Sequence, residues 1–316
     1  MPVRVPINGD TLAWARNVLG IDQEVLAKAA GVKPKRLAAF ENGEAQPTYN
    51  QATALAKRLD RPLAFLFVPP PKKSDVPETL DFRGRLLGDL PEQLNREIRR
   101  AEDHRSALLD LESLERTPEL EHVTKTNAEA RAAEFRETLG LNPTFVPPSG
   151  NSSQIFNFWR GLLEGHGYLI FQTTGIDLEV FKGLSIEHDR LPIIIVNGGD
   201  ANNSKIFTLF HEVSHIANRT SGVCLLDDDV REEEVANKFA ANCLMPREQV
   251  ERLVTSNLGA LTEPELVAAH FKVSLLASAI RLRTLDRLSE DELAMIKSET
   301  AEAWQEFRKA QISGSS

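Results

Sequence analysis

The sequence predicts a predominantly helical α+β chain, with a small all-α domain at the N-terminus and a larger domain that adds a small β-sheet to its helices. Three observations predict it. Short helical segments separated by turn signals fill residues 11–67. A β-branched run at residues 191–198 predicts a strand. Apolar residues recur at helical spacing through much of the remaining chain.

Four short helices are predicted in the N-terminal domain. They cover residues 11–19, 22–30, 35–42 and 50–59. Asp22 is the expected N-cap of the second helix, because its short side chain can accept from free backbone amides. Gly31 suits the tight turn that follows, and Pro34 at a first helical position opens the third helix.

The residues of this domain follow a known pattern. The spacing Q-x-x-L-A-x-x-A-G-V from Gln23, followed by F-E-N-G-x-x-x-P from Phe40, resembles the phage-repressor (XRE) helix-turn-helix. That resemblance implies an all-α helix-turn-helix domain whose third helix enters the major groove with its N-terminal residues foremost. The residues expected to contact DNA are Gln23, Lys33, Lys35 and Arg36.

The charge distribution favours the same partner. Residues 1–73 hold 11 Lys and Arg against 6 Asp and Glu, whereas the remainder holds 26 against 40. A basic module on an acidic body suits contact with the phosphates of double-stranded operator or promoter DNA at one end only. The alternative is that Lys35 and Arg36 form an ordinary solvated face.

A connector separates the two domains. The proline-rich run at residues 68–75 predicts a stiff, extended boundary. Residues 92–116 are highly charged, with apolar residues at helical spacing, and predict a long surface helix. The predicted domains are residues 1–73, the helix-turn-helix domain; 74–126, the helical connector; 127–290, the larger domain; and 291–316, a C-terminal helix and flexible tail.

The larger domain mixes helices and strands. Helices are predicted at residues 127–139 and 155–166, strands at 168–172 and 191–198, and a helical pair at 261–287. A further helix is expected to begin at Ser204 as N-cap and to end near residues 218–222, where Gly222 is a stop signal. An exposed edge strand of such a sheet could pair with a peptide backbone.

That helix carries the pattern H-E-x-x-H at residues 211–215. His211 and His215 lie at i and i+4, so their side chains leave the same helix face and can hold one metal ion. Neutral imidazole suits zinc, and a catalytic zinc site keeps one position open for water. Glu212 stands beside the first histidine, where it can take a proton from that water.

A third ligand is expected on the next helix, because catalytic zinc usually has three protein ligands. Its apolar stripe is Ala236, Phe239, Ala240, Cys243 and Leu244. Glu234 falls on the solvent side of this helix, whereas Glu232 and Glu233 stay near its buried face. We choose Glu233, because Asn237 lies one turn later and its amide oxygen could accept the second N–H of a ligating histidine.

These motifs resemble, in order, those of the ImmA/IrrE family of metallo-endopeptidases. The resemblance rests on H-E-x-x-H at His211, E-x-x-A-N-x-F-A at Glu233 and L-M-P at Leu244, and covers roughly residues 127–288. It implies a zincin-like (gluzincin) domain with His211, His215 and Glu233 as zinc ligands and Glu212 as general base. Family members typically cleave helix-turn-helix repressors. Cys243 departs from the residue type usual in the family and is expected to pack in the core.

Other residues leave alternatives open. Cys224 is a weaker candidate for the third ligand, and His270 or Arg281 could approach the scissile carbonyl. Two cysteines, Cys224 and Cys243, do not suggest a disulfide scaffold.

No signal peptide or transmembrane run is visible, so a cytoplasmic protein that does not enter the membrane is expected.

Two functions are compatible with these motifs. The first is a DNA-binding zinc-dependent endopeptidase and transcriptional regulator that cleaves a repressor-type protein. The alternative is an antitoxin, or a transcriptional repressor of a toxin–antitoxin operon, that binds a partner toxin through its metallopeptidase-like domain. The implied partners are DNA, a protein substrate or toxin, and a second copy of the chain in a homodimer.

Overall fold

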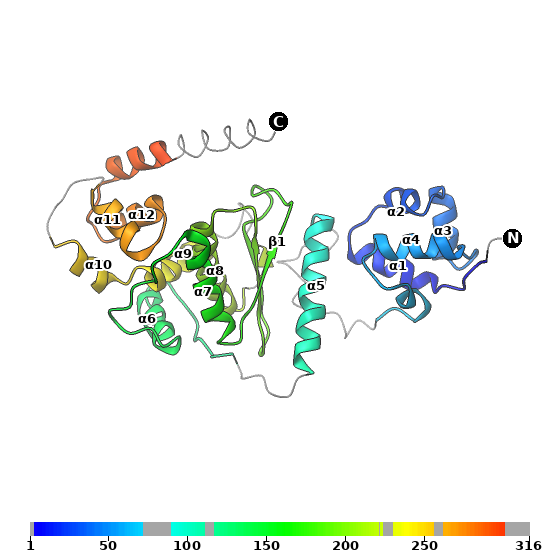
Figure 1. Cartoon of the computed structure of the whole chain (residues 1–316), viewed down its shortest axis with the longest axis horizontal. Helices are drawn as coiled ribbons and strands as arrows, with labels where there is room; N and C mark the ends of the chain where they lie inside the picture. Colours follow the sequence, from blue (N-terminus) through cyan, green and yellow to red (C-terminus); the bar gives the residue numbers. More distant parts are fainter. Residues whose placement is uncertain are drawn as a thin grey trace. The chain divides into compact units, whose positions relative to one another are not determined.

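A computed structural model describes residues 3–71, 90–110, 117–220, 222–223, 230–255 and 262–300 of the chain (Figure 1). The chain divides into two compact units, Met1–Glu112 and Ser113–Ser316. Helices predominate and a small sheet is present, so the predicted α+β class is confirmed. The division after Glu112 falls within the predicted connector, and the domain limits at residues 73, 126 and 290 stay predictions.

The first unit begins with the four expected short helices and a 3-10 helix. They are α1 (Gly9–Val18), α2 (Gln23–Ala29), α3 (Pro34–Glu41), α4 (Tyr49–Arg58) and η1 (Leu63–Phe67). Each α-helix contributes a fully buried leucine to one shared core, namely Leu12, Leu26, Leu37 and Leu55. Pro34 is the first residue of α3, as predicted.

The starts of these helices are fixed to different degrees. Asn8 caps α1 by accepting from the backbone amide of Thr11, and Thr48 forms a capping box with Gln51 at the start of α4. Asp22 precedes α2, as predicted, but its side chain makes no capping hydrogen bond. The start of α2 is therefore held by its packing rather than by a cap.

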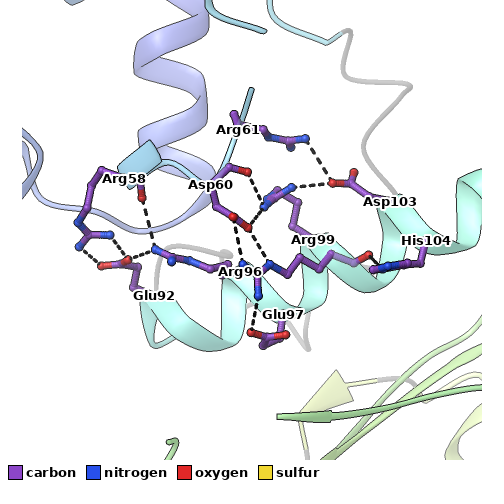
Figure 2. A network of polar contacts seen from close by, with 10 residues as sticks. Arg58, Asp60, Arg61, Glu92, Arg96, Glu97, Arg99, Asp103 and His104 are labelled. Carbon is purple, nitrogen blue, oxygen red and sulfur yellow. Dashed lines mark hydrogen bonds and ion pairs between the residues drawn. The ribbon is translucent and has the colours of Figure 1, made fainter. Parts of the chain in front are cut away.

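Helix α5 (Glu92–Leu109) belongs to this unit, and a network of ion pairs joins it to the end of α4 (Figure 2). Four pairs cross between the two segments, namely Arg58–Glu92, Arg99–Asp60, Arg100–Asp60 and Arg61–Asp103. Two more, Arg96–Glu92 and Arg99–Asp103, lie within α5. The hydrogen bond from Arg100 is the largest cause that lowers the pKa of Asp60. A carboxylate with a depressed pKa stabilises the fold above its unfolded pKa and loses that effect as pH falls through the folded value. The predicted helix over residues 92–116 is thus confirmed to Leu109, and residues 111–116 lie outside the described part.

The second unit holds a four-stranded sheet in the described part of the chain, with the order β1-β3-β2-β4. The strands are β1 (Leu169–Thr173), β2 (Gly183–Ile186), β3 (Ile193–Asn197) and β4 (Gly222–Val223). β1 is parallel to β3, whereas β2 is antiparallel to both β3 and β4. The β-branched strand β3 is buried along its length and paired on both sides. The edges of this sheet are therefore β1 and β4, where an added strand could pair.

Helices build the rest of this unit. They are α6 (Ala128–Thr138), α7 (Ser152–Glu164), α8 (Asn202–Ala217), α9 (Val230–Leu244), α10 (Arg247–Leu253), α11 (Thr262–Phe271) and α12 (Leu275–Thr284), and residues 290–300 are helical as well. Figure 1 shows α7 and α8 on one side of the sheet, and both contact it. The predicted helical pair at residues 261–287 corresponds to α11 and α12.

Aromatic side chains hold α8 and α9 together. Trp159 of α7 contacts Phe210 of α8 with 5.2 Å between ring centroids, and Phe135 of α6 lies 5.9 Å from Phe239 of α9. Phe135 also contacts Phe210, at 6.4 Å, so the four rings form one cluster. The predicted apolar stripe of α9 is buried at all five positions. Two of these contacts, Trp159–Phe210 and Phe135–Phe210, are edge-to-face, and Phe135 of α6 links the rings of α8 and α9 in one cluster.

The predicted start of α8 is wrong, whereas its predicted end is nearly right. The helix begins at Asn202 with Ala201 as N-cap, so Ser204 lies inside its first turn and its hydroxyl donates to Asp200. The helix ends at Ala217 with Asn218 as C-cap, close to the predicted end near residues 218–222. Arg219 adopts a left-handed backbone with φ 54, which takes the terminating role expected of a glycine.

Candidate metal centre

Helix α8 brings two imidazoles together, as their spacing predicts. His211 and His215 lie one turn apart, and their Nε2 atoms are 3.1 Å from each other. Both side chains are buried, because α8 packs against α9 and the sheet. Two imidazole nitrogens that converge at this distance could provide two of the ligands of one metal ion.

Helix α9 adds a carboxylate to the pair. Glu233 places Oε2 3.2 Å from Nε2 of His211 and Oε1 3.4 Å from Nε2 of His215. Ligand atoms that each lie about 2.0–2.1 Å from one tetrahedral ion are about 3.3 Å apart. The three side chains therefore form a triangle of the size that a single ion requires, and together they could hold a metal.

The outer nitrogen of each imidazole has its own partner. Nδ1 of His211 lies 3.0 Å from Oδ1 of Asn237, the contact that the sequence led us to expect. Nδ1 of His215 lies 3.0 Å from Oγ1 of Thr220, a residue that sequence reasoning missed. An oxygen that accepts from Nδ1–H leaves the lone pair of Nε2 free, so both partners direct Nε2 into the triangle.

Glu233 and His211 each favour the charged form of the other. Burial is the largest influence on Glu233 and opposes its ionisation, but the nearby imidazoles of His211 and His215 outweigh it and hold the pKa of Glu233 well below the usual range. Burial likewise opposes the charged form of His211, yet its interactions with Glu233 and Glu212 raise its pKa. Glu233 is therefore ionised, which is the form that binds a cation.

Glu212 occupies a separate position beside the triangle. Its side chain is fully buried, and neither carboxylate oxygen has a hydrogen-bond partner among the described residues. Burying an unpaired carboxylate is costly unless a cation or a hydrogen-bond donor lies nearby. A hydrated metal ion in the triangle would provide both, so the surroundings of Glu212 fit a metal centre.

Gly183 of β2 makes room for that carboxylate. A Cβ atom at this position would lie 2.5 Å from Oε1 of Glu212 and 2.4 Å from Cγ2 of Thr208, closer than real contacts allow. Only a glycine lets the strand approach α8 here. The sequence signal was a glycine inside a short apolar segment, which indicates close approach of a backbone.

The sequence left other residues open for this site. Cys224 lies outside the described residues, and Cys243 is buried in the apolar core of the unit, as expected. Arg281 is buried and donates to the carbonyl oxygen of Met245 and to Oδ1 of Asn242. Its guanidinium thus has a structural role in joining α12 to the end of α9.

The predicted DNA-contacting residues of the first unit fall into two groups. Lys33, Lys35 and Arg36 are exposed at the start of α3, and the Arg36 guanidinium lies 5.2 Å from the ring centroid of Phe40. Gln23 is half-buried, and its amide nitrogen donates to Glu41 at 2.7 Å. The exposed cations are placed for contact with a partner, whereas Gln23 helps to hold α2 against α3.

No helix in the described ranges is long and apolar enough to cross a membrane.

The comparison with curated proteins found no match. Among solved structures, Bacillus thuringiensis PlcR in complex with the peptide PapR7 and DNA aligns over 98% of this chain and 99% of that chain at 10% identity. Its TM-score of 0.20 is too low to carry an argument.

Two sequence families match, each over one part of the chain. A helix-turn-helix family matches residues 12–66, and the family of the IrrE N-terminal-like domain matches residues 168–283. The first match covers most of α1, all of α2 to α4 and most of η1, and the second covers the sheet and the triangle of His211, His215 and Glu233. Both predicted resemblances are confirmed, and the chain joins a helix-turn-helix domain to an IrrE N-terminal-like domain.

Proposed function

We propose that this protein is a DNA-binding transcriptional regulator whose second unit is a zinc-dependent endopeptidase. The observation that carries the peptidase assignment is Glu212, a buried carboxylate without a hydrogen-bond partner in the described part of the chain, placed next to the triangle of His211, His215 and Glu233. Two imidazoles and one carboxylate are a donor set typical of catalytic zinc, which keeps a fourth position open.

The chain's own residues supply the proton transfers. When bound, zinc polarises a carbonyl group and makes water more acidic. Glu212 accepts a proton from the attacking water and later delivers it to the leaving amine of the cleaved peptide. His211, His215 and Glu233 would hold the ion, while Asn237 and Thr220 orient the two imidazoles.

The proposed substrate is a repressor-type protein, as the IrrE-like domain suggests. The test is to incubate the purified chain, with zinc, with the proteins encoded beside its gene and to measure fragments by mass spectrometry. We expect cleavage that a chelator abolishes and added zinc restores. A chain that holds one zinc ion but cleaves none of these proteins would contradict the peptidase assignment.

The division of charge favours a second candidate function. The basic residues 1–73 can contact DNA while the acidic remainder, with 40 Asp and Glu against 26 Lys and Arg, holds a partner protein. In that case the protein is an antitoxin or operon repressor, and the metal centre stabilises the fold of the second unit and does not cleave a peptide. A toxin encoded beside the gene and neutralised without being cut would favour this candidate.

The surface of α3 gives a prediction about DNA. Lys35→Ala combined with Arg36→Ala should weaken binding to the protein's own promoter region, because both side chains are exposed at the expected groove-facing end. If each contacts one phosphate, the slope of log K against log salt should fall by about 2. Gel-shift titrations at several salt concentrations measure both quantities.

Lys57→Ala is the control for that experiment. Lys57 is exposed as well, but it lies in the last turn of α4 rather than at the start of α3. Its loss should change affinity much less than the double substitution. An effect of Lys57→Ala half as large as that of the double substitution, in proportion to the single charge removed, would mean that only the overall charge of the unit matters and that α3 does not face the DNA.

A further inference from the structure

The chain segment after α8 folds back onto the helix in a defined way. Arg219, in its left-handed conformation, donates its backbone N–H to the carbonyl oxygen of Ile216 at 3.1 Å. Thr220 donates its backbone N–H to the carbonyl oxygen of His215 at 3.0 Å. These two bonds form a Schellman motif, in which one left-handed residue returns the next residue to the last turn of the helix.

This turn makes Thr220 contact one candidate ligand twice. Its backbone amide binds the carbonyl oxygen of His215, and its side-chain Oγ1 lies 3.0 Å from Nδ1 of the same residue. When the hydroxyl oxygen accepts from Nδ1–H, the imidazole is fixed as the tautomer whose Nε2 faces His211 and Glu233. Asn237 acts in the same way on His211, but from a different helix.

The turn is anchored by its own polar contacts. Asn218 accepts from the backbone N–H of Val123 at 2.7 Å and donates to its carbonyl oxygen at 2.8 Å. On the other side, Ile216, Asn218 and Arg219 line a cavity of about 330 Å³. The position of Thr220 therefore depends on the hydrogen bonds of the turn and on Asn218.

We propose that Thr220 is a positioning residue for the metal centre. Its hydroxyl sets the tautomer and the rotation of the His215 ring, and the left-handed turn at Arg219 brings the hydroxyl to that ring. This inference rests on the proposed metal site and deepens it, because it assigns part of the affinity for the ion to a turn outside the H-E-x-x-H motif. It predicts that metal affinity responds to changes at Thr220 although Thr220 does not bind the ion.

The test compares Thr220→Val with Thr220→Ser by zinc titration against a competing chelator. Valine keeps the shape but removes the acceptor, and zinc affinity should fall by about 10–100-fold, the effect typical of lost partners of metal ligands. Serine keeps the hydroxyl and should bind nearly as the wild type does. Cobalt(II) substituted for zinc should show a changed visible spectrum in the valine variant only. Thermal unfolding of the metal-free variants should be similar, which separates positioning from folding.

Arg219 provides a second, matched pair of variants. Arg219→Gly and Arg219→Val both remove the ion pair of Arg219 with Glu187, but only glycine accepts the left-handed conformation freely. Zinc affinity should therefore fall in the valine variant and be kept in the glycine variant. Wild-type affinity and spectrum in Thr220→Val, or equal affinities of the two Arg219 variants, would overturn the inference. Failure of the wild type itself to bind zinc would instead overturn the proposed metal site.

Discussion

Replacing Glu212 by Gln should reduce peptide cleavage by several orders of magnitude while zinc remains bound. The amide keeps the size of the side chain but cannot accept the proton from water or return it to the leaving amine. Glu212 is not among the three residues of the triangle, so the ligand set is unchanged. The replacement also removes a buried charge that has no hydrogen-bond partner in the described residues, so the fold should be at least as stable as before.

This variant also distinguishes the two candidate functions. Wild type and Glu212→Gln are compared for cleavage of the partner protein, for DNA binding and for rescue of growth in cells that express the partner. Loss of both cleavage and rescue supports the peptidase. Rescue that persists without cleavage assigns the function to binding, and cleavage that persists in the variant rules out Glu212 as the base.

The second large effect concerns the metal. The wild type, purified without chelator, should contain about one zinc ion per chain, and the double variant His211→Ala with His215→Ala should contain none. Both imidazoles point their Nε2 atoms into the triangle, and a lone carboxylate cannot hold zinc tightly. Elemental analysis measures the content, and added zinc should raise the unfolding temperature of the wild type only.

Two adjacent glutamates give a matched control for the third ligand. Glu233→Ala should lower zinc affinity strongly, because Glu233 lies within 3.4 Å of both histidines. Glu234→Ala should leave it unchanged, because Glu234 is exposed and pairs with Lys125 on the surface. Full zinc content in the double histidine variant, or equal effects of the two glutamate variants, would contradict the ligand assignment.

The parts of this site that sequence alone could predict are those defined within one helix. The spacing of His211 and His215 places both side chains on one face of α8. The constant rotation per residue along α9 places Glu233 near the buried face of that helix and Glu234 on its solvent side. Asn237 follows from the same count, and the structure places its oxygen beside His211. Periodicity was sufficient here because a helix relates its own residues by a constant rotation.

The features that sequence could not predict depend on contacts between distant segments or on unusual backbone geometry. Gly183 belongs to a four-residue strand that was not predicted, and its role appears only when β2 lies on α8. Thr220 reaches His215 because an arginine adopts a conformation that favours glycine. The prediction of Ser204 as N-cap was wrong because its hydroxyl is used by Asp200. Local propensity cannot anticipate such competition for hydrogen bonds.

The ion-pair network between α4 and α5 has a consequence for behaviour on heating. Hydration of charged groups becomes less favourable as temperature rises, so the desolvation cost of an ion-pair network decreases. The arginine and carboxylate groups of Figure 2 share partners, with Asp60 bound by both Arg99 and Arg100. The attachment of α5 to the helix-turn-helix domain should therefore weaken less on warming than isolated surface pairs would suggest, and α5 should remain joined to that domain until the domain itself melts.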